Sequence, residues 1–119
     1  MRLVRHRSDL DVCLPVGEID LCTAPLLRRA LRDTAQRRVP RVIVDLSQVE
    51  FLGLEGIRVL VTAAEHARAT HRHLGLVVAT HSIWRALELT GMAGGLATYG
   101  CLSDALCELP AGGRDGAGR

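Results

Sequence analysis

Residues 41–67 read RVIVDLSQVEFLGLEGIRVLVTAAEHA. The run Val42-Ile43-Val44 is continuous and β-branched, which is typical of a central strand covered on both faces. A loop is expected over 49–54, and apolar residues then recur at helical spacing, predicting a helix from about Glu55 to His73. These apolar residues are Ile57, Leu60, Val61, Ala64 and Ala67. A buried strand leading into an amphipathic helix indicates a βαβ arrangement.

The same alternation of patterns continues on both sides of this stretch. Short apolar or alternating runs predict strands over 3–6, 10–16, 74–79 and 96–99. Helices are expected from a Thr23 N-cap to Pro40, from a Ser82 cap to Leu89, and from a Ser103 cap to Leu109. Gly17 breaks the second strand, and residues 18–21 are expected to lead into the first helix. The sequence predicts an α/β fold with a sheet of four or five strands, mixed but largely parallel, and about four packed helices.

Length and composition favour one domain over 1–109, followed by a Gly-rich tail over 110–119 that we expect to be disordered. No apolar run is long enough to cross a membrane, and no apolar segment follows the basic residues 1–7. We therefore expect a cytoplasmic protein with no membrane association. The net charge of +2 is small, which argues against a nucleic-acid partner.

The sequence carries no pattern of catalytic or metal-binding residues. Its four cysteines form no CxxC pair and are expected to be reduced, buried small hydrophobes: Cys13, Cys22, Cys101 and Cys107. The histidines of residues 66–73 have no ligand partners at metal spacing. There is no phosphate-binding Gly-rich loop and no recognisable Ser-His-Asp arrangement. We expect neither a metal, a cofactor nor an enzymatic activity.

Three segments together resemble the STAS family of sulfate transporters and anti-sigma factor antagonists. They are GEIDLCTAPLL over 17–27, VDLSQVEFL over 44–52 and LELTGM over 87–92. The resemblance covers about 2–109, and the single-domain bacterial antagonists are the most similar subgroup. It implies a STAS-type fold, a regulatory role in sigma factor-dependent transcription, and an anti-sigma factor or kinase-like protein as partner. Asp20 and Thr23 then belong to the family's turn between strand and helix.

The resemblance places a partner-binding loop at Gly53, Leu54, Glu55 and Gly56. Antagonists of this family carry D-S-[ST]-G there, and a partner kinase phosphorylates the second hydroxyl residue. Glu55 stands at that position, so we expect no phosphorylation in this loop. Glu55 has two interpretations of equal weight. It mimics the phosphate imperfectly with a single charge, or it stabilises the first turn of its helix by about 0.3–1 kcal/mol through the helix dipole.

Arg58, Thr62 and Glu65 form a candidate partner-binding face on the following helix, although each alone is typical of a solvent-facing position. Phe51 is the only Phe, and we expect it to be a core residue. The alternative function is a scaffold or accessory subunit in a larger signalling or transport complex.

Overall fold

The computed structural model describes residues 2–91 and 96–109, which form seven strands and four helices. In chain order the elements are β1 (Arg2–Arg7), β2 (Leu10–Leu14), β3 (Gly17–Ile19), α1 (Ala24–Gln36), β4 (Arg41–Asp45), β5 (Val49–Leu52), α2 (Leu54–Ala69), β6 (His73–Val77), α3 (His81–Leu89), β7 (Ala97–Tyr99) and α4 (Leu102–Glu108). The tail expected over 110–119 lies outside the described residues.

Five strands make one sheet in the order β1-β2-β4-β6-β7, while β3 and β5 make a separate pair. β1 runs antiparallel to β2, and every other neighbouring pair is parallel. The predicted α/β fold, with a largely parallel sheet and a mixed N-terminal edge, is confirmed. None of the helices in the described ranges combines the length and the apolar character needed to span a membrane.

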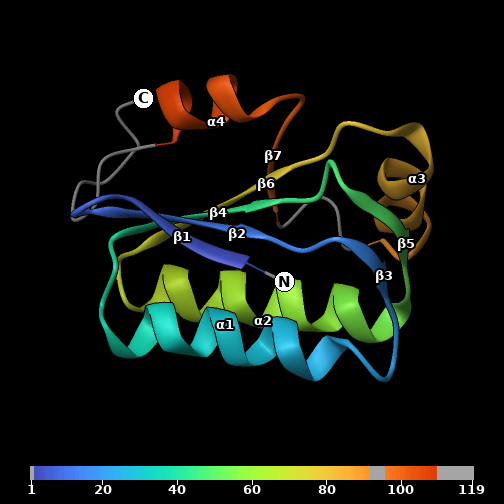
Figure 1. The fold of residues 1–119 in the computed structure, drawn as a ribbon, viewed down its shortest axis with the longest axis horizontal. Coiled ribbons are helices and arrows are strands. Elements are labelled where there is room, and N and C mark those ends of the chain that lie inside the picture. The colour runs from blue at the N-terminus through green and yellow to red at the C-terminus, as the bar shows by residue number, and fades with distance from the viewer. Residues whose placement is uncertain (1, 92–95, 110–119) are drawn as a thin grey trace.

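The sheet separates two apolar clusters. Figure 1 shows α1 and α2 side by side on one face of the sheet and α4 on the other. All five residues of β4 are buried. Val42 and Val44 belong to the cluster under α1 and α2, whereas Ile43 belongs to the cluster under α4. Because side chains alternate along a strand, helices on both faces require a continuous apolar run. The prediction of a central strand here is confirmed.

The second helix is shorter than predicted, because α2 ends at Ala69 and not at His73. The Thr70 hydroxyl donates to the carbonyl oxygen of His66 at 2.8 Å, and His71 adopts a positive φ of 60°. These two residues turn the chain, so that His73 already pairs with Arg41 as the first residue of β6. The strand expected over 74–79 therefore begins and ends earlier.

The ends of several other helices and strands also differ from the predictions. Thr80 occupies the N-cap position of α3 in place of Ser82, and Cys101 precedes α4 in place of Ser103. α1 ends at Gln36, before Pro40, and β2 ends at Leu14. The expected edge strand near the C-terminus is confirmed as β7.

The largest correction concerns β3 and β5. We expected residues 18–21 to lead into a helix and residues 49–54 to form a loop. Gly17–Ile19 and Val49–Leu52 instead pair as parallel strands. Strands of three and four residues are too short to produce a periodic sequence pattern, and only their pairing across 30 or so residues of chain stabilises them.

Candidate protein-binding surface

The β3–β5 pair holds the start of α2. The amide of Gly53 donates to the carbonyl oxygen of Ile19 at 2.8 Å, and the amide of Ile57 donates to the carbonyl oxygen of Gly53 at 3.1 Å. Gly53 is extended at the N-cap position and provides no side-chain cap. The predicted loop residues 53–56 are thus the N-cap and the first turn of α2, and one backbone hydrogen bond, from Gly53 to Ile19, ties them to β3.

Within this turn the side chains point in different directions. Leu54 is 46% exposed, and the Glu55 side chain is 40% exposed. Glu55 Oε2 lies 3.8 Å from an Arg58 guanidinium nitrogen, a separation at which an exposed pair stabilises little. Gly56 is buried, since a Cβ there would lie 2.6 Å from Ile19 Cγ2. Leu54 and Glu55 therefore face outward while Gly56 packs against β3.

Phe51 is not a core residue, contrary to our expectation. It lies on β5 opposite Glu18 and is 52% exposed. Its ring rests over Gly53, where a Cβ would come within 3.2 Å of Phe51 Cε2. The ring is thus held against the loop by the small residue beneath it and presents its other face to solvent.

Phe51 is part of a larger group of exposed apolar residues. Seven large apolar side chains are exposed in the described ranges. Apart from Val4, they lie on or next to β3 and β5 or on helices attached to that pair. Val16 and Leu21 flank β3, Leu26 is in the first turn of α1, Phe51 is on β5, Leu54 begins α2, and Leu89 ends α3, which packs against β5. We call these six residues the apolar end surface: Val16, Leu21, Leu26, Phe51, Leu54 and Leu89. Such clustering at one end of a small domain is typical of a protein-binding site, whereas single exposed apolar residues are common.

The turn between β3 and α1 lies beside this surface. The carboxylate of Asp20 accepts hydrogen bonds from the amides of Cys22 and Thr23, each at 3.0 Å. The Thr23 hydroxyl accepts from the Asp20 amide at 2.9 Å. Thr23 occupies the predicted N-cap position, but its side chain makes no capping bond to α1 and secures the turn instead. The hydrogen bonds from Thr23 hold the pKa of Asp20 below its ordinary value of 3.8.

Asp20 should make stability depend on acid pH. Since folding lowers the pKa of this carboxyl, its contribution is present above the unfolded pKa and is lost as pH falls through the folded value. We expect Asp20→Ala to lower the free energy of unfolding at neutral pH, with the difference from the unchanged protein shrinking below about pH 4. Urea unfolding between neutral pH and below about pH 4 measures the free energy of unfolding of both proteins, and Glu65→Ala, which removes an exposed carboxylate, is the control. A difference that is constant with pH would contradict this role.

The three candidate residues of the α2 face are all exposed and, at positions i, i+4 and i+7 of one continuous helix, lie on the same side of it. Arg58 and Thr62 line a groove between α1 and α2, together with Glu55. Glu65 lies one turn beyond Thr62 and is not among the groove residues. A partner-binding role for this face stays a prediction.

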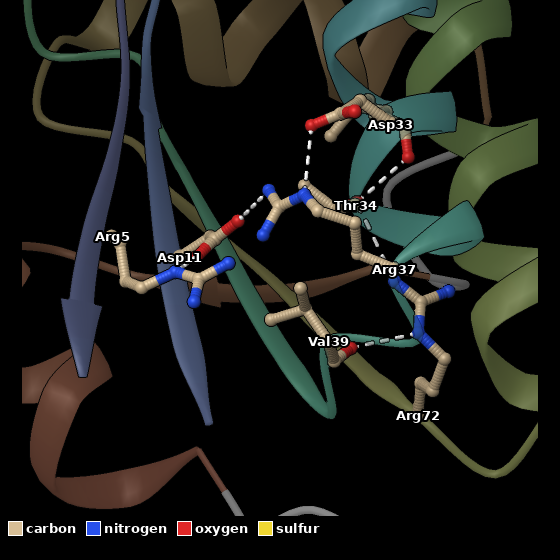
Figure 2. Close-up of polar contacts among 8 residues, drawn as sticks. Arg5, Asp11, Asp33, Thr34, Arg37, Val39 and Arg72 are labelled. Carbon is tan, nitrogen blue, oxygen red and sulfur yellow. Dashed lines mark hydrogen bonds and ion pairs between the residues drawn. The ribbon is translucent and has the colours of Figure 1, made fainter. Parts of the chain in front are cut away.

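An ionic cluster around the buried Asp11, which the sequence did not indicate, lies at the other end of α1. Figure 2 shows Arg37 between Asp11 and Asp33. The Asp11 side chain is 1% exposed; Arg37 contacts it at 2.5 Å, and Arg5 lies 3.8 Å away. The hydrogen bond to Asp11, supported by Asp33, raises the pKa of Arg37. This cluster joins β1, β2 and α1, so it serves the packing of the fold and not the apolar end surface.

The cysteines correct another expectation. All four are free thiols, but only Cys13 is buried; Cys22, Cys101 and Cys107 are exposed. Burial raises the pKa of the Cys13 thiol to about 12, so this thiol stays protonated at neutral pH. The apolar character of cysteine therefore predicted burial wrongly for three of the four cysteines.

Comparison with known proteins finds a family and relatives that match most of this chain. A family model described as "Mlab, STAS domain" matches residues 5–114. The anti-sigma-F factor antagonist RsfB of Mycobacterium tuberculosis is 31% identical over 96 residues, which cover 81% of this chain and 78% of RsfB. The anti-sigma-B factor antagonist of Listeria monocytogenes is 28% identical over 89 residues, covering 75% and 77% of the two chains.

Solved structures agree with the family match. The crystal structure of an anti-sigma factor antagonist from Mycobacterium paratuberculosis superposes with a TM-score of 0.81 at 33% identity, covering 88% of this chain and 89% of the other. The unphosphorylated form of the anti-sigma factor antagonist SpoIIAA gives a TM-score of 0.71 at 13% identity, covering 89% and 93%. At that identity the likeness to SpoIIAA concerns the fold alone.

Proposed function

Because the chain belongs to the STAS domain family and resembles anti-sigma factor antagonists over most of its length, we propose that it binds an anti-sigma factor of the kinase type. Binding would release a sigma factor and so control transcription in the cytoplasm. The observation that carries the proposal is the apolar end surface around the loop 53–56. The chain acts in this proposal by occupying its partner and catalyses no reaction.

The composition of the surface supports this role. Phe51 and Leu54 are large apolar side chains held on a rigid strand and a helix start, so little conformational entropy is lost when they are covered. Aromatic residues such as Phe are enriched in the fully buried core of protein interfaces. Glu55, Arg58 and Thr62 supply polar groups at the rim.

Affinity capture from the lysate of the source cell tests the proposal. We expect the unchanged protein to retain an anti-sigma factor identified by mass spectrometry, and Leu54→Asp to lose it, because an unpaired carboxylate would be desolvated at the interface. Val4→Asp is the matched control, since Val4 is the one exposed large apolar residue in the described ranges that lies outside the apolar end surface. Capture of the same anti-sigma factor by the Leu54→Asp protein would overturn the proposal.

Glu55 gives the proposed function its regulatory form. Residues 53–56 carry no hydroxyl group that could form a phosphate ester, so we expect a kinase of the Ser/Thr type with ATP to phosphorylate none of them. Glu55 keeps part of the negative charge permanently, and negative charge disfavours docking if the partner presents its own carboxylates.

We therefore expect Glu55→Ser to change the affinity for the captured partner by at least about fivefold, near 1 kcal/mol, toward tighter binding. Calorimetry at one salt concentration measures the change. Asp104→Ser, which removes an exposed carboxylate from the first turn of α4 on the opposite face of the sheet, should leave the affinity unaltered. Equal affinities for Glu55→Ser and the unchanged protein would reduce Glu55 to a residue of the helix start.

A further inference from the structure

A groove of about 360 Å³ runs between α1 and α2 on the helical face of the molecule. Its walls are one stripe from each helix, with Arg28 and Arg32 on α1 and residues from Glu55 to His66 on α2. The α2 stripe extends over three turns, about 16 Å at 1.5 Å per residue. Both helices begin near the β3–β5 pair, so one end of the groove opens beside the loop 53–56 (Figure 1).

The groove carries an excess of positive charge. Four guanidinium groups line it, from Arg28, Arg32, Arg58 and Arg72, and Glu55 is the one carboxylate among the described lining residues. Neither Arg28 nor Arg32 has an ion pair or side-chain hydrogen bond within the ranges that the structure describes.

Arg72 bonds only to neutral acceptors in the described residues, with Nε donating to the carbonyl oxygen of Val39 at 2.8 Å and a second nitrogen 3.4 Å from the Thr34 hydroxyl (Figure 2). No carboxylate of the described chain compensates its charge, although burial lowers the pKa of this guanidinium. An anion entering the groove would supply the missing counter-charge.

The bottom of the groove is apolar. Leu31 and Val59 are 5% and 6% exposed, and Leu74 contributes from β6. A free phosphate would use the guanidinium groups and leave this floor uncovered. Arg28 and Arg32 are one helical turn apart, and Arg72 lies near Thr34, further along α1, so the charges are spread along the groove and do not converge on one point. An elongated occupant with both carboxylates and apolar side chains fits this pattern.

We propose that the groove between α1 and α2 binds an acidic amphipathic helix of a partner protein. The apolar stripe of that helix would cover Leu31 and Val59, and its flanking carboxylates would pair with Arg28, Arg32 and Arg58. Helix-in-groove recognition suits this face because the groove walls are two helices, which offer no strand edge for an extended peptide. The inference goes beyond the proposed function, because it defines a second surface that shares only its rim, at Glu55, Arg58 and Thr62, with the first.

Synthetic peptides test this inference without any anti-sigma factor. The probe is a fluorescein-labelled amphipathic helix with a Leu stripe flanked by Glu; one control peptide replaces Glu with Lys, and another replaces Leu with Ser. Fluorescence anisotropy is expected to detect binding of the Leu/Glu peptide alone, weakening as salt increases. The double variant Arg28→Glu, Arg32→Glu should weaken this binding at least about tenfold, and Arg29→Glu on the exposed side of α1 by less than about twofold.

Thr62→Trp provides a steric variant, because Thr62 is exposed and lines the groove, so the larger side chain fills it without entering the core. It should also abolish peptide binding, while Phe51→Ala should leave it unchanged and so separate this groove from the apolar end surface. Equal effects of Arg29→Glu and the double variant would overturn the inference, as would binding of all three peptides or of none. Binding of the control peptide that carries Ser in place of Leu as tightly as the Leu/Glu peptide, with displacement of both by pyrophosphate, would assign the groove to a free anion instead.

Discussion

Replacing Phe51 with alanine is expected to weaken binding to the proposed protein partner by at least about thirtyfold, near 2 kcal/mol. The ring belongs to the apolar end surface, is half exposed, and is already fixed against Gly53. Its truncation removes contact area from the complex, with little repacking in the free protein. The free energy of unfolding should fall by no more than about 1 kcal/mol, because only half of the ring is buried in the isolated domain.

Isothermal calorimetry with the purified partner measures the affinity, and urea unfolding measures the stability. Val4→Ala is the matched control, since it also truncates an exposed apolar side chain but lies on β1. If Phe51→Ala binds as tightly as the unchanged protein, the partner uses another face. If it unfolds readily, the ring has a structural role that its exposure does not indicate.

Gly56→Val is expected to destabilise the domain by about 3 kcal/mol. A Cβ at this position would lie 2.6 Å from Ile19 Cγ2 and 2.8 Å from Leu52 Cδ1, both closer than carbon atoms approach without displacement. Gly56→Ala introduces the same Cβ clash, but alanine also favours the helix by about 1 kcal/mol relative to glycine, which offsets part of the cost. We therefore expect Gly56→Ala to lower the free energy of unfolding by about 1 kcal/mol.

Urea unfolding of both variants measures these losses. Gly100→Ala is the control, because a Cβ there would meet no atom within 4 Å, and it should change stability by less than about 0.5 kcal/mol. A Gly56→Val protein as stable as the unchanged one would mean that β3 and the start of α2 can separate freely. In that case the geometry of the loop 53–56 would not depend on this contact.

Helices and strands long enough to show a repeating pattern of apolar residues could be predicted from the sequence. The run Val42-Ile43-Val44 identified the central strand, and the spacing of Leu60, Ala64 and Ala67 identified α2. β3 and β5 could not be predicted in this way, because they are short and stabilise each other only through a pairing distant in sequence. The exposure of Phe51 follows from the same pairing, since hydrophobicity alone favours the interior.

The loop 53–56 and the Asp20–Thr23 turn were located through the family resemblance, and the structure gives their hydrogen bonds. The groove residues could not be brought together from sequence, because Arg28 and Arg58 become neighbours only when α1 and α2 lie on the same face of the sheet. The ion pair between Asp11 and Arg37 was missed for a similar reason. Helical and strand periods describe single elements, and these contacts form between elements.

In the described residues, the β3–β5 pair belongs to a different sheet from the other five strands, although its Ile19 and Leu52 pack into the apolar cluster under α1 and α2. Phe51 on this pair and Leu54 just after it can therefore change in sequence without altering the pairing of the five-stranded sheet. A gene duplication would leave two copies free to diverge at these positions while both continue to fold. Such an arrangement allows one scaffold to present different exposed residues at these positions while the five-stranded sheet keeps its pairing.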